Sequence, residues 1–294
     1  RGAGDQRRGV REELHPEGRR VAPLRRRVSL PHVTLPIFVP GDDPGPDFVG
    51  LLGRLGVGAF ESTVPFDAGQ ITHGTTVLAI RYSDGVLMAG DRRATSGHLI
   101  SHRSIQKVFP ADSYSGVAIA GAAGPAMEMV RLFQLQLEHY EKVEGNVLTL
   151  DGKANQLSQM LRNHLPAAMQ GLAVVPLFAG FDPRTGQGRL FQFDVTGGRY
   201  EERDYAAIGS GGLHASTVVK LRHHDGIGAD EAIDVAIEAI FQAADEDIAT
   251  GGPDTVRGIY PVVALITVDG FEQLADDDVA ARTGTLLDRL RGAS

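Results

Sequence analysis

From Thr75 onwards, groups of predicted strands alternate with pairs of predicted helices, and this order limits the folds that the chain can adopt. Short runs rich in Val, Leu, Ile and Ala indicate strands at 75–82, 85–95, 105–110, 114–124, 173–182, 188–198 and 258–270. Apolar residues at helical spacing indicate helices at 125–143, 153–170, 213–223 and 230–247. This order suggests two sheets packed face to face with helices on both outer faces, an α+β layered architecture.

The segment before Thr75 has a different composition, and we expect it to be a separate unit. Residues 1–46 are rich in Arg, Pro and Gly and are expected to be irregular and disordered. Four apolar residues between Phe48 and Leu55 then fall at i, i+3, i+4 and i+7, which indicates one short amphipathic helix or turn pair. Because nearby glycines weaken such a helix, we expect it to dock on the body of the protein.

Composition excludes several classes of site and location. The chain has no cysteine, so it has no disulfide, no thiolate metal site and no cysteine nucleophile. No apolar run reaches the roughly 18 residues that a membrane span requires. The arginines of residues 1–27 are not followed by the apolar segment of a secretory signal. We therefore expect a soluble, cytoplasmic protein that does not associate with a membrane.

The net charge of −8 conceals a basic segment at residues 1–27, where nine arginines stand against one Asp and three Glu. A basic stretch of this kind can bind nucleic acid. Here no aromatic residue interleaves the arginines and no apolar helical face accompanies them, so a solvated tail is the better interpretation. We expect no nucleic-acid partner.

The stretch ITHGTTVLAI, residues 71–80, places Gly74 and Thr75 where irregular sequence gives way to strands. Because threonine favours strands, an ordinary strand start is one interpretation. A cleavage site is the other, since a threonine hydroxyl needs a base beside it to act as a nucleophile. Cutting the bond between Gly74 and Thr75 would create an α-amine with a pKa of about 7.7 to 8.0, which suits a general base. Before the cut the same nitrogen is an amide, so the uncut chain would be inactive.

Two charged residues follow Thr75 at intervals of 16 residues, Asp91 in GDRRAT and Lys107 in SIQKVFP. The turn signal Ser83-Asp84-Gly85 predicts a hairpin. Such a hairpin would return Asp91 to the neighbourhood of Thr75, and Lys107 on the next strand could lie beside both. Each charge also has a simpler interpretation, as a surface ion pair of Asp91 with the arginines that follow it or as a solvent-facing Lys107.

Together the motifs HGTTVLAIRYSDGVLMAGDRRAT, IQKVFP, VAIAGAAG, AIGSGG and ATGGPDTVRGIYP resemble the β subunits of the 20S proteasome. The long segment before Thr75 makes the chain most similar to the actinobacterial type, and the resemblance extends from residue 72 to about residue 270. It implies a four-layer αββα Ntn-hydrolase sandwich of two antiparallel sheets flanked by helices. It also implies a propeptide at residues 1–74, and a mature catalytic domain at 75–294 with a flexible C-terminal tail.

The resemblance assigns roles to residues around the junction of Gly74 and Thr75. Thr75 would be the nucleophile, Lys107 would be an ammonium that favours deprotonation of its hydroxyl, and Asp91 would hold Lys107 in place. Ser210 in GSGG and Asp254 in GGPD match family positions that hydrogen-bond near the terminal amine.

Substrate contacts follow from the same resemblance. The backbone N–H of Gly121 matches the donor that stabilises the tetrahedral intermediate. Thr95, Gly121 and Ala123 match positions whose backbone pairs with an extended peptide. The side chain that precedes the scissile bond would enter an apolar pocket formed by Ala94, Ile105, Phe109, Ile119, Ala123 and Met127. We therefore expect cleavage after Leu, Phe or Tyr in preference to charged residues.

Other features suggest no further chemistry. The GSGG loop lacks the further glycine and lysine of a phosphate-binding loop. His223 and His224 are expected to cap a helix end, since no partner ligands are spaced for a metal site. We expect no metal and no cofactor. One departure from the family concerns the third position after Asp254, where many relatives have a serine and this chain has Arg257.

The sequence thus predicts an N-terminal-threonine endopeptidase, made as a precursor and cleaved by itself between Gly74 and Thr75. By resemblance it would degrade unfolded polypeptides within stacked heptameric rings of α and β subunits, served by a regulatory ATPase ring. Two rivals remain open. One is the bacterial two-ring threonine protease that partners an ATPase directly, which the long propeptide disfavours. The other is an inert structural β-type subunit, which the joint presence of Thr75, Asp91, Lys107 and Gly121 disfavours.

Overall fold

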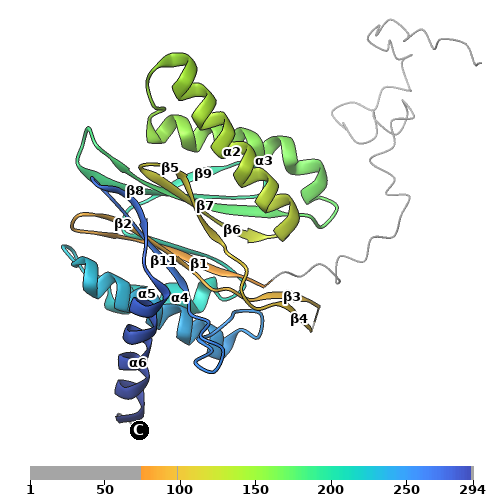
Figure 1. Cartoon of the computed structure of the whole chain (residues 1–294). Helices are drawn as coiled ribbons and strands as arrows, with labels where there is room; N and C mark the ends of the chain where they lie inside the picture. Colours follow the sequence, from red (N-terminus) through yellow and green to blue (C-terminus); the bar gives the residue numbers. More distant parts are fainter. Residues whose placement is uncertain (1–73, 98, 293–294) are drawn as a thin grey trace, which may run out of the picture. The chain divides into compact units, whose positions relative to one another are not determined.

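A computed structural model describes residues 74–97 and 99–292 of the chain (Figure 1). The disorder expected at residues 1–46 and the docking segment from Phe48 to Leu55 lie outside the described residues. Within the described part, no helix is long and apolar enough to cross a membrane.

Two five-stranded antiparallel sheets form the centre of the domain. The first has the order β10-β1-β2-β11-β12, and its strands are β1 (Thr76–Tyr82), β2 (Gly85–Gly90), β10 (Tyr205–Gly209), β11 (Val262–Thr267) and β12 (Gly270–Gln273). The second has the order β5-β6-β7-β8-β9, and its strands are β5 (Val108–Asp112), β6 (Ser115–Gly121), β7 (Val174–Asp182), β8 (Gln187–Phe193) and β9 (Arg199–Glu202). A separate hairpin pairs β3 (Ala94–Ser96) with β4 (Leu99–His102).

Helices cover the outer faces of both sheets (Figure 1). The helices are α2 (Ala123–Glu144), α3 (Leu150–Ala168), α4 (Gly212–Arg222), α5 (Ala229–Glu246) and α6 (Asp276–Gly292). The pair α2 and α3 covers the second sheet, whereas α4 and α5 cover the first and α6 packs on α5. The domain is therefore the expected α+β sandwich with helix layers outside two sheets.

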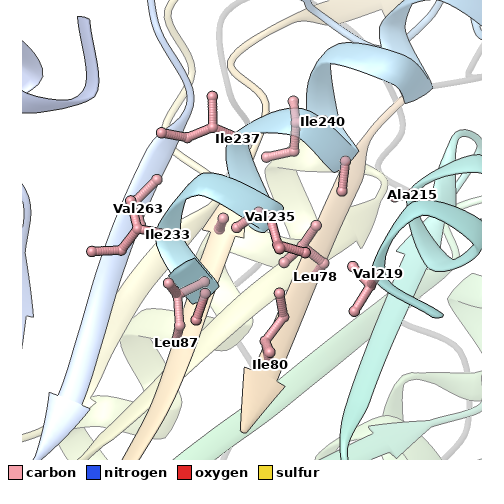
Figure 2. Close-up of a cluster of buried hydrophobic side chains, with 14 of the residues drawn as sticks. Leu78, Ile80, Leu87, Ala215, Val219, Ile233, Val235, Ile237, Ile240 and Val263 are labelled. Carbon is pink, nitrogen blue, oxygen red and sulfur yellow. The ribbon is translucent and has the colours of Figure 1, made fainter. Parts of the chain in front are cut away.

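The alternation of side chains along each strand explains why both faces of a sheet are apolar. In β1, Val77 and Ala79 belong to the buried cluster between the two sheets, while Leu78 and Ile80 belong to the cluster under α4 and α5. Figure 2 shows Leu78 and Ile80 beneath α5, whose inward face carries Ile233 among other aliphatic side chains. Because β1 is packed on both faces, its two ends are held in fixed positions.

The predicted helices agree with α2 to α5 within a few residues, but the expected flexible C-terminal tail is wrong. Residues Asp276–Gly292 form α6, which buries Val279, Thr283 and Leu286. These residues fall at i, i+4 and i+7, a stripe of only two aliphatic side chains that gives a weak sequence signal. Three acidic residues in the first turn also favour a helix start there. The short strands β3, β4, β9, β10 and β12 were not separately predicted.

Candidate active site

The hairpin of β1 and β2 brings Asp91 to the start of β1, as its turn signal predicted. Val77 pairs with Gly90, so Asp91 lies just beyond the end of the ladder. Its Oδ1 accepts a hydrogen bond of 2.8 Å from the amide of Thr76. The charge that stands 16 residues after Thr75 is therefore in contact with the residue that follows Thr75.

Lys107 immediately precedes β5 and forms a buried ion pair with Asp91. Its Nζ lies 2.7 Å from Asp91 Oδ1, and 3% of Lys107 and none of Asp91 is exposed to solvent. Asp91 Oδ2 accepts two more hydrogen bonds of 2.8 Å, from the amides of Arg93 and Gly251. Burial lowers the pKa of the Lys107 ammonium, although the carboxylate of Asp91 opposes that shift.

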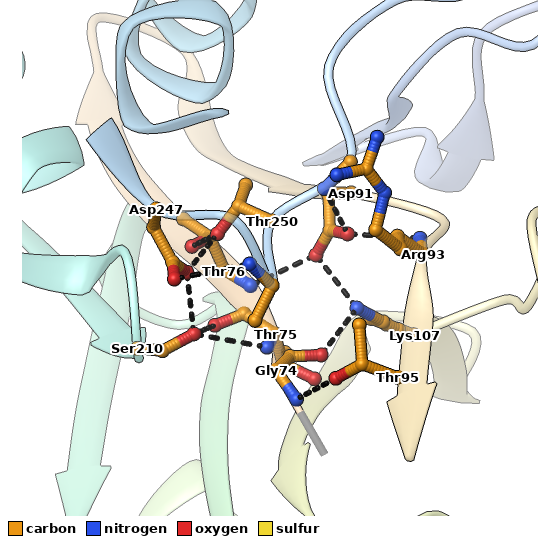
Figure 3. A network of polar contacts seen from close by, with 12 residues as sticks. Gly74, Thr75, Thr76, Asp91, Arg93, Thr95, Lys107, Ser210, Asp247 and Thr250 are labelled. Carbon is orange, nitrogen blue, oxygen red and sulfur yellow. Dashed lines mark hydrogen bonds and ion pairs between the residues drawn. The ribbon is translucent and has the colours of Figure 1, made fainter. Parts of the chain in front are cut away.

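The peptide bond between Gly74 and Thr75 lies against this ion pair (Figure 3). Lys107 Nζ donates a hydrogen bond of 3.3 Å to the carbonyl oxygen of Gly74. On the other side, the amide of Gly74 donates to Thr95 Oγ1 at 3.1 Å. The cation therefore contacts the carbonyl group of the bond at the predicted cleavage site, and Thr75 itself is buried.

Ser210 contacts the nitrogen of the same bond from the first sheet. Thr76 pairs with Gly209 at the end of β10, which places Ser210 beside Thr75. The Thr75 amide donates to Ser210 Oγ at 3.3 Å. Gly209 has a φ of 98°, and a Cβ atom there would lie 1.9 Å from the carbonyl oxygen of Thr75. Only glycine allows this close approach.

Asp254 does not take the position near the Thr75 nitrogen that the resemblance implies. In the described part of the chain its carboxylate bonds to Arg257, accepting from the backbone amide at 3.0 Å and from Nη1 at 2.6 Å. The carboxylate that contacts Ser210 is instead Asp247, whose Oδ2 lies 2.5 Å from Ser210 Oγ. The assignment of Asp254 to the surroundings of the Thr75 nitrogen is therefore wrong.

The same correction removes the apparent departure at Arg257. The third residue after Asp247 is Thr250, whose hydroxyl donates to Asp247 Oδ2 at 2.5 Å. A hydroxyl therefore does stand three residues after the relevant aspartate. Sequence reasoning missed Asp247 because DEDIATGGPD holds four acidic residues, and their order along the chain does not indicate which one faces β10.

Hydrogen bonds keep Asp247 ionised. Burial alone would raise its pKa, but hydrogen bonds from Ser210, Thr250 and the amide of Ala249 outweigh that effect and hold the pKa below its ordinary value. Asp247 is therefore a carboxylate at neutral pH, an acceptor that carries no hydrogen of its own.

Five of the predicted substrate residues lie on β5, on β6 or at the start of α2. Gly121 ends β6 with a φ of 100°, and Ala123 begins α2. Phe109 and Ile119 project from β5 and β6 into the cluster covered by α2, and Met127 lies in the second turn of that helix with 36% of its surface exposed. The remaining pocket residues are Ala94, which is buried at the start of β3, and Ile105, which is half-buried between β4 and β5.

Within residues 74–97 and 99–292, no group of three or more His, Asp or Glu side chains is arranged to hold a metal ion. His223 Nε2 contacts the carbonyl oxygen of Arg81, and His224 pairs with Glu231. His223, at the end of α4, therefore contacts β1, and His224 contacts the first turn of α5.

Comparison with known proteins agrees with this geometry. A family model described as proteasome subunit matches residues 71–258. A proteasome subunit beta from Acidimicrobium ferrooxidans is 56% identical over 245 residues, which cover 83% of this chain and 90% of that protein. Proteins of the same name from Frankia casuarinae and a Parafrankia species are 46% and 48% identical, over 87% and 82% of this chain and 93% and 88% of their own lengths. The chain therefore belongs to the proteasome subunit family as a β subunit, a threonine-type endopeptidase.

Proposed function

We propose that this chain is a precursor that cuts itself between Gly74 and Thr75 and then degrades unfolded polypeptides with Thr75 as its nucleophile. One observation carries the proposal: the bond between these two residues lies between a buried ammonium and a hydroxyl. Lys107 Nζ contacts the Gly74 carbonyl oxygen, and Ser210 Oγ contacts the Thr75 nitrogen. The ammonium polarises the carbonyl that is attacked, and the hydroxyl holds the nitrogen that leaves.

Self-cleavage proceeds through an ester. The Thr75 hydroxyl oxygen attacks the carbonyl carbon of Gly74, and the bond from that carbon to the Thr75 nitrogen breaks. The hydroxyl proton passes to the nitrogen, which becomes an amine. Water then hydrolyses the ester, so that residues 1–74 leave as a propeptide with a carboxylate at Gly74 and the Thr75 hydroxyl is restored.

The mature site repeats the same attack on a substrate. The free α-amine of Thr75 accepts the hydroxyl proton, and the Lys107 ammonium, held by Asp91, favours the ionised oxygen. The backbone N–H of Gly121 stabilises the tetrahedral intermediate. An extended polypeptide pairs with the backbone of Thr95, Gly121 and Ala123, which requires that the substrate be unfolded locally.

The relatives named proteasome subunit beta support assembly with other proteasome subunits in rings. We propose stacked heptameric rings with α subunits outside the β subunits, a regulatory ATPase ring that delivers the substrate, and a cytoplasmic location. Membership of the family supports the assembly in rings, and the ATPase ring and the location are proposed from the resemblance alone.

Intact-mass measurement after co-expression with an α subunit tests the proposal. Wild-type chain is expected to begin at Thr75 and to hydrolyse a fluorogenic peptide, whereas Thr75→Ala should retain residues 1–74 and show no hydrolysis. Thr217→Ala, on the exposed face of α4, is the matched control and should be processed and active.

Three results would contradict the proposal. Trimming of Thr75→Ala to residue 75, when every β subunit carries the variant, would exclude self-cleavage. A wild-type chain that assembles but does not begin at Thr75 would favour an inert structural subunit. Active particles that form without any α subunit, as judged by native mass spectrometry, would favour the two-ring protease.

A further inference from the structure

Thr76 has a side chain that the proposed mechanism does not use, although it is fully buried beside the nucleophile. Its backbone amide donates to Asp91. Its hydroxyl oxygen lies 2.6 Å from the hydroxyl oxygen of Thr250, and neither residue is exposed. Thr76 therefore bonds to Asp91 through its backbone amide and to Thr250 through its side chain (Figure 3).

Counting hydrogens gives the direction of each bond in this network. Ser210 and Thr250 each have one hydroxyl hydrogen, and both hydroxyls lie 2.5 Å from Oδ2 of Asp247, which can only accept. Because Thr250 donates its hydrogen to Asp247, the bond between the two threonines must be donated by Thr76. Ser210 has two acceptors within reach, Asp247 Oδ2 at 2.5 Å and the carbonyl oxygen of Thr75 at 3.4 Å, and the much shorter contact shows that its hydrogen goes to Asp247. The Ser210 oxygen therefore accepts from the nitrogen of Thr75.

The result is a closed ring of hydrogen bonds. It runs from the Thr75 nitrogen through Ser210, Asp247 and Thr250 to the Thr76 hydroxyl, and the covalent link between Thr76 and Thr75 closes it. A ring of this kind restricts the rotation of each hydroxyl, since each hydroxyl hydrogen points to an acceptor within the ring.

Gly211 leaves the space that this ring occupies. A Cβ atom at Gly211 would lie 2.3 Å from Thr76 Oγ1 and 2.6 Å from Thr250 Oγ1. The backbone there has a φ of −88°, which any residue can adopt. Space rather than backbone conformation therefore requires glycine at this position, and the space is that of the two hydroxyl groups.

We propose that Thr76 is a positioning residue for Thr75, and that its hydroxyl acts through Thr250 and Asp247 to hold the Ser210 oxygen as an acceptor for the Thr75 nitrogen. This inference rests on the proposed function. In the mature enzyme the Thr75 nitrogen is an amine with hydrogens and one lone pair. An oxygen that can only accept takes one of its hydrogens, which leaves the lone pair free to turn towards the Thr75 hydroxyl.

Two substitutions at one position separate the hydroxyl from the shape of the side chain. Thr76→Val keeps the shape and removes the hydroxyl, whereas Thr76→Ser keeps the hydroxyl and removes a methyl group. Thr283→Val is the matched control, because Thr283 is equally buried and its hydroxyl bonds only to the backbone of α6 in the described structure. Each variant is made in the full chain and co-expressed with an α subunit.

We expect Thr76→Val to lower kcat about fivefold, the effect of losing one buried hydrogen bond, with KM nearly unchanged. Its self-cleavage, followed by intact mass, should slow by a similar factor. Thr76→Ser should recover most of both rates. Thr283→Val should match the wild type in both rates even where its Tm falls. If Thr76→Val does not accumulate as folded particles, Gly211→Ala displaces the same hydroxyls and should lower kcat likewise.

Wild-type kcat in Thr76→Val, or equal losses in the Val and Ser variants, would overturn the positioning role. So would a loss of kcat in Thr283→Val as large as that in Thr76→Val. Thr75→Ala, measured in parallel, separates this failure from that of the proposed function. Activity in Thr75→Ala would contradict the role of Thr75 as the nucleophile, and with it the proposed function. An inactive Thr75→Ala together with a fully active Thr76→Val would contradict only the role of Thr76.

Discussion

Four donors bond to the buried carboxyl group of Asp91. The amides of Thr76, Arg93 and Gly251 and the ammonium of Lys107 all bond to its two oxygens. When Lys107 is replaced, the three backbone amides still bond to Asp91, and they offset part of the cost of removing the cation from a buried ion pair. Variants of Lys107 should therefore fold, and their effect on activity can be measured.

The alkaline pH dependence of catalysis should identify the Lys107 ammonium. Because burial lowers its pKa, Lys107 loses its proton below the ordinary lysine value of 10.5. The cation is present below that pKa and lost above it, so kcat should fall at alkaline pH with a midpoint below 10.5. Lys107→Arg should keep its charge and lose this alkaline fall, although its kcat at neutral pH should be lower.

The measurement is kcat from pH 7 to pH 11 on particles whose assembly is checked by native mass spectrometry at each pH. An alkaline fall with the same midpoint in Lys107→Arg and in the wild type would assign that ionisation to another group.

Gly74 should matter for processing and not for catalysis. A Cβ atom at this position would lie 1.8 Å from Ala249 Cβ and 2.7 Å from its carbonyl oxygen. Gly74→Ala must therefore shift the carbonyl that is attacked, and we expect self-cleavage to slow at least tenfold. In the proposed function residues 1–74 leave on cleavage, so chains that do mature should be identical to the wild type and show the same kcat per processed chain.

Intact mass against time and peptide hydrolysis on one sample check both halves of this prediction. Ala249→Gly in the Gly74→Ala background removes the closest contact and should restore part of the rate. If Gly74→Ala were cleaved at the wild-type rate, the loop at Ala249 would have to move to accommodate the added Cβ atom at little cost.

At the scale of elements, the end of α5 positions the carboxylate that acts on Ser210. One face of α5 packs on β1 through Ile233, Ile237 and Ile240, which lie over Leu78 (Figure 2). The helix ends at Glu246, so Asp247 is the first residue beyond it. The apolar packing of a helix thus determines where a charged residue of the site lies.

The elements β5, β6 and α2 should also decide what the enzyme cuts. None of the six residues proposed to form the pocket is charged, so such a pocket would gain roughly 25 cal/mol per Å² of apolar surface that it buries. It offers a charged side chain no compensation for lost hydration. We expect kcat/KM for peptides with Leu, Phe or Tyr before the scissile bond to exceed that for Arg, Lys, Asp or Glu by about 10- to 200-fold.

A panel of fluorogenic peptides that differ only at that residue measures the preference. Met127→Glu should raise the relative rate of the Arg peptide, because it adds a carboxylate at the pocket. Arg131→Glu, exposed one turn further along α2, should leave the preference unchanged. A faster Arg or Glu peptide than every apolar one, with the wild type, would mean that the pocket lies elsewhere.

At the scale of the whole molecule, the described residues form three buried apolar clusters that connect the layers of the sandwich. One lies between the sheets, one under α2 and α3, and one under α4 and α5, which α6 joins through Val279 and Leu286. The last helix therefore adds to the same core that holds β1.

Loss of packing in α6 should weaken the domain without changing its chemistry. Leu286 is 6% exposed, so Leu286→Ala should lower the free energy of unfolding by about 2–4 kcal/mol. Denaturant unfolding measures this change, with the exposed Leu213→Ala as control. Wild-type stability in Leu286→Ala would mean that α6 contributes little to the core. The kcat per processed chain should equal that of the wild type in both variants.

Sequence alone determined the parts of this protein that depend on neighbouring residues. The turn at Ser83-Asp84-Gly85 and the alternating apolar residues around it specify the hairpin of β1 and β2, and that hairpin places Asp91 beside Thr76. Periodicity likewise predicted α2 to α5, since the stripe on each helix is a local pattern. The layered order of the fold follows from these elements, because each must bury its apolar face.

Only the tertiary structure decided which distant groups meet. Asp247 and Asp254 stand only seven positions apart in the sequence. Asp247 is distinguished by its contact with Ser210, which lies 37 residues before it. The bond between the hydroxyls of Thr76 and Thr250 spans 174 residues. Pairings of this kind have no period and no spacing in the sequence, because they are set by how helix ends and loops pack over the sheet.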